Sequence, residues 1–275
     1  MITLTGFADE ISPDLDTQLD VLQEEGIGYL ELRSVWKTNV LKLSDVQVKE
    51  IKEKLDSRGI KVSSIGSPIG KIKITDDFAS HLIDFRRAIT LAKYFETPFI
   101  RIFSFLIPEG ERPERYKDEV LLRMKELVAI AEQEQVILLH ENEKHIYGDT
   151  GERCRDLFEA CNSSHFRSAF DPANFIQCGV QPMADAHPLL HAYVSYIHVK
   201  DAMMESGKVV PAGEGDAQLA ELLTALKSGK YEGFLSLEPH LKAEGRFHGY
   251  SGADLFKTAS HAIKGMLQQA DIGWK

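Results

Sequence analysis

Short apolar runs alternate with longer segments of helical periodicity along the whole chain. Such runs of four to eight residues, rich in Val, Ile, Phe and Tyr, are typical of strands. Eight of them recur at a spacing of about 30 residues, which is the spacing of βα units in a parallel sheet. They lie at residues 2–7, 29–33, 61–66, 98–103, 136–141, 166–171, 194–201 and 233–238.

The segments between these runs predict helices. The clearest is 113–134, which opens on a proline and carries Leu, Met and Ile at helical spacing. Others are expected over 16–25, 44–57, 76–94, 151–161, 216–227 and 251–269, with a shorter one over 182–193. Because no linker or low-complexity tract divides the chain, eight βα units in one run predict a single α/β domain over residues 1–275.

The expected architecture is a closed (β/α)₈ TIM barrel rather than an open doubly wound sheet. The first strand is followed by TGFADE, which offers one glycine and no GxGxxG pattern, so a dinucleotide-binding fold is not indicated. A chain of 275 residues is also within the range of one such barrel.

Composition excludes several classes of protein. A hydrophobic fraction of 43% with 27% charged residues is typical of globular proteins, and no apolar run approaches the roughly 18 residues of a membrane span. The first residues, MITLTGFADEISPDLD, do not resemble a secretory signal, so a cytoplasmic location is expected. Cys154, Cys161 and Cys178 lack CxxC spacing and are interpreted as plain thiols.

The net charge of -10 and a pI near 5.5 are the opposite of what a phosphate-backbone binder requires. We therefore expect a small-molecule ligand, and neither nucleic acid nor membrane as a partner.

Polar residues gather at the ends of the predicted strands. In YIHVKD, Ile197 and Val199 would face the helices, which directs His198 and Lys200 into the barrel mouth. The same alternation directs Glu141 inward at the end of the fifth strand, and Asp171 and Glu238 end the sixth and eighth. Chemistry in TIM barrels collects at these carboxyl ends.

Three carboxylates that converge with one imidazole in one mouth would repel one another and have strongly shifted pKa values unless a cation lay among them. An oxygen-rich set with one imidazole suits Mn²⁺, Mg²⁺ or Co²⁺ better than a structural zinc. The alternative is that each acid caps the following helix or pairs with a nearby Lys or Arg. Four such residues on successive strands, all of inward parity, favour the metal.

The segments LHENEKHIYGDTGE, FDPANF, YIHVKD, VPAGEGD and YEGFLSLEPH, one per strand in this order, resemble the xylose-isomerase-like TIM-barrel superfamily, the sugar phosphate isomerase/epimerase group. The resemblance covers nearly the whole chain. It implies that Glu141, Asp171, His198 and Glu238 bind one divalent ion, usually Mn²⁺, with Mg²⁺, Co²⁺ or Zn²⁺ as alternatives. It also implies that Glu141 and Glu238 are the catalytic acid/base pair, and it leaves a homo-oligomer open.

The expected reaction is isomerisation or epimerisation of a small sugar or sugar phosphate. Glu-mediated proton transfer would pass through a metal-stabilised enediolate. Two other enzyme classes and a binding protein remain as alternatives. A lyase or dehydratase would act on a keto-inositol or 3-keto-sugar, a hydrolase would resemble the endonuclease IV branch, and a sugar-binding protein would not turn over. The acidic charge and scarcity of inward histidines disfavour the hydrolase.

Four further residues are expected to contact substrate. Asn174 stands where many relatives have the histidine of a DxxH motif, so the substrate is expected to differ from the usual ketohexoses. Lys200 and Arg33 have inward parity, and His240 follows Glu238 by two positions. For Lys200 a salt bridge to Asp201 or to an acid of a neighbouring strand is an equal alternative.

Two groups of polar residues are expected to be structural. Glu31 and Arg101 are both directed inward, and we expect a buried ion pair between them, with substrate contact as the alternative. The remaining histidines that we assign to the surface or to caps are His145, His187, His191, His248 and His261.

Overall fold

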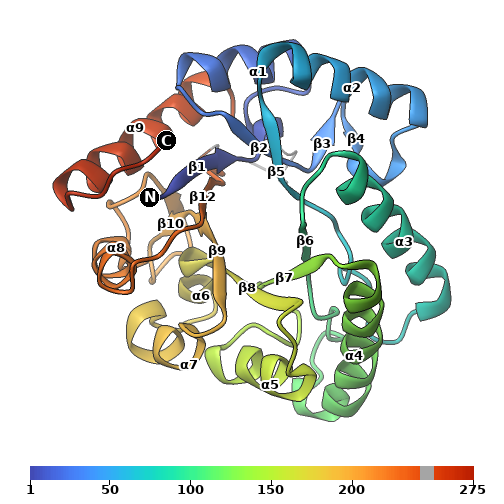
Figure 1. The fold of residues 1–275 in the computed structure, drawn as a ribbon. Helices are drawn as coiled ribbons and strands as arrows, with labels where there is room; N and C mark the ends of the chain where they lie inside the picture. The colour runs from blue at the N-terminus through green and yellow to red at the C-terminus, as the bar shows by residue number, and fades with distance from the viewer. Residues whose placement is uncertain (242–250) are drawn as a thin grey trace.

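Eight parallel strands surround a central axis and helices cover the outside in the computed structural model, which describes residues 1–241 and 251–275 (Figure 1). The sheet order is β1-β12-β9-β8-β7-β6-β5-β2. A parallel bridge between Phe7 and Glu31 joins the two end strands, so the barrel is nearly closed. The predicted single-domain TIM-barrel fold is confirmed.

The barrel strands follow the predicted runs to within two residues at each end. They are β1 (Thr3–Gly6), β2 (Tyr29–Leu32), β5 (Lys61–Ile65), β6 (Phe99–Ile102), β7 (Ile137–Glu141), β8 (Phe166–Phe170), β9 (Val194–Val199) and β12 (Phe234–Leu237). Two short hairpins lie outside the barrel, β3 (Ser34–Val35) with β4 (Thr38–Asn39), and β10 (Asp201–Ala202) with β11 (Val209–Val210).

The helices begin at side-chain caps where the sequence offers Ser, Thr or Asp. Ser44 and Gln47 form a capping box, and Gly59 ends the same helix at φ 67°, which favours glycine. The helices are α1 (Leu15–Glu24), α2 (Asp45–Arg58), α3 (Phe78–Tyr94), α4 (Lys117–Glu134), α5 (Gly151–Cys161), α6 (Pro172–Gln177), α7 (His187–Leu190), α8 (Leu219–Ser228) and α9 (Ala253–Gln269).

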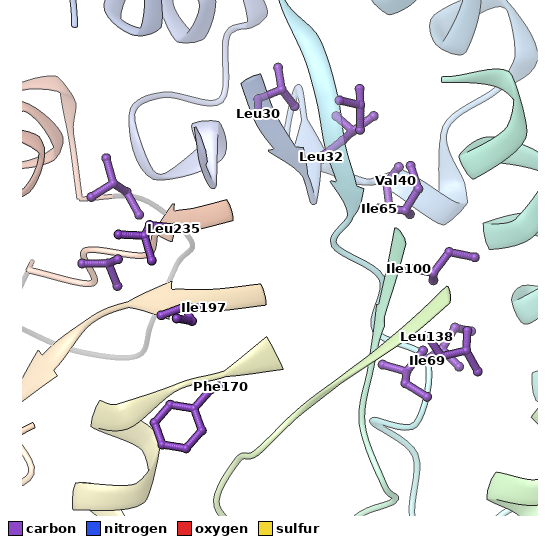
Figure 2. Packing of buried hydrophobic residues seen from close by; sticks show 14 of the residues in the cluster. Leu30, Leu32, Val40, Ile65, Ile69, Ile100, Leu138, Phe170, Ile197 and Leu235 are labelled. Atoms are coloured by element: carbon purple, nitrogen blue, oxygen red, sulfur yellow. The ribbon is translucent and has the colours of Figure 1, made fainter. Parts of the chain in front are cut away.

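The main core lies between the strands and the helices. Leu30, Ile100, Leu138, Ile197 and Leu235 point outward from their strands into this layer and are fully buried (Figure 2). Alternate positions point into the barrel, where a smaller cluster of Leu139, Ala169 and Tyr196 fills the lower part. The alternation therefore carries the polar residues of the upper strand ends into the mouth.

Two general features of the chain complete the description. The three cysteines are free. Within residues 1–241 and 251–275, no helix is both long enough and apolar enough to cross a membrane.

Candidate metal and substrate site

A cavity of about 600 Å³ opens at the carboxyl ends of the barrel strands. It is lined by residues from all eight βα units, which include Arg33, Arg101, Glu141, Asn174, Lys200, Glu238 and His240. The four residues that the sequence predicts to contact substrate therefore all line it. A wider hollow of about 840 Å³ lies between α8, α9 and the loop that follows β9.

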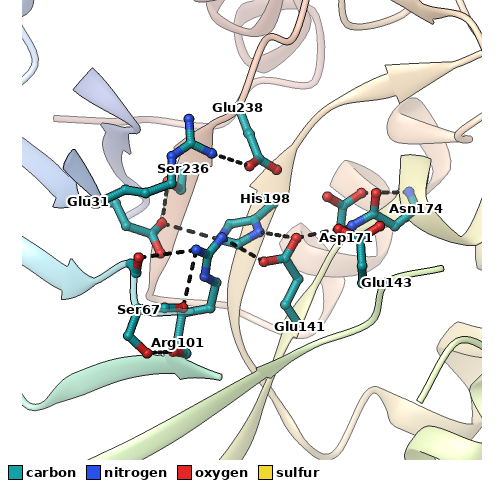
Figure 3. Close-up of polar contacts among 12 residues, drawn as sticks. Glu31, Ser67, Arg101, Glu141, Glu143, Asp171, Asn174, His198, Ser236 and Glu238 are labelled. Atoms are coloured by element: carbon teal, nitrogen blue, oxygen red, sulfur yellow. Dashed lines mark hydrogen bonds and ion pairs between the residues drawn. The ribbon is translucent and has the colours of Figure 1, made fainter. Parts of the chain in front are cut away.

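Glu141, Asp171, His198 and Glu238 converge at the floor of this cavity (Figure 3). Each side chain offers one ligand atom, these atoms all lie within 4.8 Å of one another, and all four residues are buried. Glu141 and His198 belong to β7 and β9, while Asp171 and Glu238 directly follow β8 and β12. Neighbouring strands of one barrel thus bring together residues almost 100 positions apart.

His198 has a different partner at each ring nitrogen. Its Nε2 lies 3.2 Å from Oε2 of Glu31, which also accepts a hydrogen bond of 2.7 Å from Ser236. Its Nδ1 lies 3.4 Å from Oε1 of Glu141 and makes no hydrogen bond among the described residues. Because Glu31 accepts the proton of Nε2, Nδ1 is the ring nitrogen that faces the other three ligand candidates, where a bound cation would take the place of its proton.

Glu141 is held by two donors on opposite oxygens. Arg101 donates to Oε2 at 3.0 Å, and Nδ2 of Asn174 donates to Oε1 at 3.1 Å. Burial alone would raise the pKa of Glu141, but the positive charges of His198 and Arg101 hold it well below its usual range. The side chain is therefore an ionised carboxylate, ready to ligate a cation or accept a proton.

The predicted ion pair between Glu31 and Arg101 is wrong. Arg101 on β6 is in register with Leu139 of the adjacent β7, so its guanidinium reaches Glu141 two residues further along that strand. Its Nη2 donates to the carbonyl oxygens of both Gly66 and Ser67. β5 separates β6 from β2, and Glu31 on β2 instead pairs with His198.

Asp171 serves two purposes at once. Its Oδ1 accepts the N–H of Asn174 at 2.8 Å and so caps α6, as the structural alternative anticipated. Its Oδ2 lies 2.8 Å from Nζ of Lys200. Burial raises the pKa of Asp171 to about 6, against the opposing charge of Lys200. One oxygen is thus committed to the helix, and the other faces the cluster.

Lys200 is buried and bridges two of the four residues. Its Nζ lies 2.8 Å from Asp171 and 3.0 Å from Oε2 of Glu238. The expected alternative partner Asp201 does not pair with it, because the Asp201 carboxylate accepts four backbone N–H bonds from residues 202, 213, 215 and 217. Lys200 instead pairs with acids that follow the two neighbouring strands, as the same alternative allowed.

Glu238 is surrounded by cationic side chains. Arg33 donates to its Oε1 at 2.9 Å, and Nε2 of His240 lies 3.2 Å from the same oxygen. Burial would raise the pKa of Glu238, but the charges of Lys200 and His240 hold it well below the usual range. Glu238, like Glu141, is therefore ionised at neutral pH.

Sequence reasoning missed two acids that follow β1. Arg33 binds Oδ2 of Asp9 at 2.8 Å and Oε1 of Glu10 at 2.9 Å, in addition to Glu238. Its guanidinium also lies 4.3 Å from the centre of the Phe7 ring. The signal was present in FADE, where two acids follow a strand end, as at the other strands. Arg33 thus links the first, second and eighth βα units at the mouth.

Four of the five histidines that we assign to the surface or to caps lie within the described residues, and none of these four belongs to the converging group. His145, His191 and His261 are exposed, and His187 is half-buried against Phe170. His248 lies outside the described residues.

Comparison with known proteins gives a family and several similar folds. A family model described as xylose isomerase-like TIM barrel matches residues 19–261. No curated protein matches the sequence. Among solved structures, one described as IOLI protein with a binding zinc atom has a TM-score of 0.79 at 17% identity, covering 98% of this chain and 99% of the other.

Two further structures have different described activities. A D-tagatose 3-epimerase-like protein has a TM-score of 0.78 at 16% identity, over 98% of both chains. A probable 3-DHS dehydratase, AsbF from Bacillus anthracis, has a TM-score of 0.74 at 16% identity, covering 96% of this chain and 99% of that one. At such identities these likenesses describe the fold.

Proposed function

This chain belongs to the xylose isomerase-like TIM barrel family, and from that premise we propose that it is a divalent-metal-dependent isomerase or epimerase of a small carbohydrate. The observation that carries the proposal is the convergence of Glu141, Asp171, His198 and Glu238 to within 4.8 Å at the floor of a cavity. The fold likeness to an epimerase-like protein supports the same reaction class.

The four side chains fit a divalent ion. Ligand atoms about 2.1 Å from a common centre lie at most about 4.2 Å apart, so closure by roughly half an ångström or slightly more would complete the site. Nδ1 of His198 is buried and makes no hydrogen bond among the described residues, so such an ion would bind there in place of a proton. We propose Mn²⁺, with Mg²⁺, Co²⁺ and Zn²⁺ as alternatives. When bound, the ion would polarise adjacent substrate oxygens and acidify the neighbouring C–H.

Glu141 and Glu238 are the proposed proton carriers. Both are ionised, and they reach the cavity from different sides of the barrel, Glu141 from β7 and Glu238 from the end of β12. One carboxylate would remove the proton beside the carbonyl, and the other would return one to the same or the neighbouring carbon. Such general acid/base transfer contributes about 10²–10⁴-fold to a rate.

Four more residues would bind and orient the substrate. Arg33, Lys200, Asn174 and His240 line the cavity around the two glutamates. Asn174 uses its Nδ2 group on Glu141 and on the carbonyl of Asn142, so it also orients the proposed base. An amide at this position donates hydrogen bonds but carries no proton in the reaction.

A lyase or dehydratase of a keto-inositol or 3-keto-sugar is the second candidate. Proton removal beside a carbonyl is common to both reactions, but a lyase must also protonate a leaving oxygen. His240, which lines the cavity 3.2 Å from Glu238, is a group with the chemistry for that step. The dehydratase fold likeness supports this candidate.

The test is solvent deuterium incorporation into keto-sugars, inososes and 3-keto-glycosides in the presence of Mn²⁺, measured by mass spectrometry. Exchange without loss of mass is expected for an isomerase, and loss of water or an alcohol would favour the lyase. Glu141→Gln and Glu238→Gln should each abolish exchange and keep the fold. Glu143→Gln is the control, because Glu143 lines the same cavity outside the four-residue cluster. Wild-type rates in both active-site variants would refute the assignment.

A further inference from the structure

The cavity has the opposite charge to the rest of the protein. The chain carries a formal charge of -10, yet lysine and arginine outnumber aspartate and glutamate among the described residues that line the cavity. The cations are Arg33, Lys37, Lys71, Arg101, Lys144 and Lys200, and the acids are Asp9, Glu141, Glu143 and Glu238. A basic hollow in an acidic protein concentrates anions by focusing the field.

The inner and outer cations differ in what they contact. The inner three, Arg33, Arg101 and Lys200, each contact at least one residue of the converging cluster. Their charge is therefore balanced by carboxylates within the protein, which leaves the outer lysines as the source of the excess positive charge.

The outer three cations, Lys37, Lys71 and Lys144, are exposed at the mouth and have little balancing charge. Lys71 lies 3.3 Å from Glu143, the one acid at this end among the described lining residues. Within residues 1–241 and 251–275, no ion pair involves Lys37 or Lys144, and Nζ of Lys144 contacts only the amide oxygen of Gln177, at 3.4 Å.

The backbone at Lys37 shows that this side chain is placed at a conformational cost. β3 and β4 are joined by a two-residue turn of Trp36 and Lys37, with φ of 53° and 60°. Hairpin turns of this kind normally use Asn-Gly or Gly-Gly, because other residues are strained at positive φ. Neither Trp nor Lys favours this turn. The presence of lysine at position 37 is therefore better explained by the position of its side chain at the cavity.

We propose that the substrate carries an anionic group, a phosphate or a carboxylate, at the end remote from the reacting carbons, and that Lys37, Lys71 and Lys144 bind it. This inference rests on the proposed function for the position of the reacting carbons. The buried cluster would hold the carbonyl end at the floor of the cavity. The anionic end would then reach the exposed lysines, where charge-assisted hydrogen bonds replace its water.

Calorimetric titration tests the charge preference without requiring turnover. The Mn²⁺-supplemented protein is titrated with a neutral ketohexose, its 6-phosphate, a hexuronate of the same length, and inorganic phosphate. We expect the charged sugars to bind at least about tenfold more tightly than the neutral one, and the preference to weaken with added salt. The phosphate and carboxylate arms show which of the two anions is preferred.

Substitution assigns the effect to the outer lysines. The double variant Lys37→Gln/Lys144→Gln should weaken binding of the preferred charged sugar at least about tenfold. The matched control is Lys61→Gln/Lys125→Gln, which removes the same charge from two exposed lysines that do not line the cavity. The control should bind as the wild type does.

Three results separate this inference from the proposed function. Equal affinity for neutral and charged sugars, or equal losses in both double variants, would overturn the inference even if deuterium exchange is observed. Preferential binding of charged sugars without exchange of any substrate would support anion binding and refute the isomerase. Exchange only with charged sugars, lost at subsaturating concentration in Lys37→Gln/Lys144→Gln, would support both.

Discussion

Replacing Glu31 with glutamine perturbs the proposed metal site without touching a ligand. Glu31 is buried, and its Oε2 accepts from Ser236 at 2.7 Å and lies 3.2 Å from Nε2 of His198. Glutamine keeps the volume but removes the charge, and its amide can donate toward Nε2. In that arrangement the imidazole proton would move to Nδ1, the nitrogen that faces Glu141.

The expected loss of Mn²⁺ affinity follows from the role of residues, such as Glu31, that hydrogen-bond a metal ligand. Removing the acceptor that fixes a metal-bound imidazole costs about 10- to 100-fold in affinity, or roughly 1.4 to 2.8 kcal/mol. We therefore expect the dissociation constant for Mn²⁺ to rise by that factor in Glu31→Gln. Calorimetric titration of the metal-free protein with Mn²⁺ measures it directly, and circular dichroism reports whether the variant is folded.

The control is Glu143→Gln, which removes the same charge from the cavity without contacting His198. Glu143 is partly exposed and pairs with Lys71, so solvent screens its charge. Interactions of such charges are worth under about 1 kcal/mol, and the Mn²⁺ affinity should therefore change by no more than about fivefold. Unchanged Mn²⁺ affinity in a folded Glu31→Gln would refute the reasoning that Glu31 sets the ligand nitrogen of His198. An equal change in Mn²⁺ affinity in Glu31→Gln and Glu143→Gln would show that the loss of a negative charge alone explains the effect.

Three other predictions concern stability and turnover. Asp201→Ala leaves four backbone N–H groups without their acceptor, so chemical denaturation should show a loss of about 2–4 kcal/mol, whereas a loss under 0.5 kcal/mol would contradict the role of the carboxylate. Gly70→Ala would place a Cβ 2.0 Å from the carbonyl oxygen of Phe103 at φ +86°, so the melting temperature should fall by several degrees, and an unchanged one would be inconsistent with this packing. Asn174→Ala should slow exchange about tenfold or more with little change in Mn²⁺ affinity, because Asn174 orients Glu141; an undiminished rate would assign Asn174 to structure alone.

The barrel could be predicted because each strand and helix has its own local pattern. Period-two alternation located all eight strands, and the same parity directed Glu141 and His198 into the mouth. α6 (Pro172–Gln177) was not predicted because six residues carry too little periodicity to be distinguished from a loop. The β10–β11 hairpin was missed for a similar reason, since it pairs only two residues of each strand.

The partners of the charged residues were harder to predict, because parity gives the face of a strand but not its register. Arg101 and Glu31 both point inward, yet the register of β6 with β7 brings Arg101 to Glu141. Lys200 could be assigned to Asp201 or to neighbouring strands, and only the fold of the loop to residue 217 shows that backbone N–H groups occupy Asp201. Such pairings depend on distances between strands that the sequence does not contain.

The central claim is that four residues from four βα units hold one divalent ion, and anomalous diffraction from a crystal soaked in Mn²⁺ tests it most directly. We predict a single strong anomalous peak about 2.0–2.3 Å from one atom each of Glu141, Asp171, His198 and Glu238. A saturated soak that leaves this position empty, or that places Mn²⁺ on other residues, would contradict the claim.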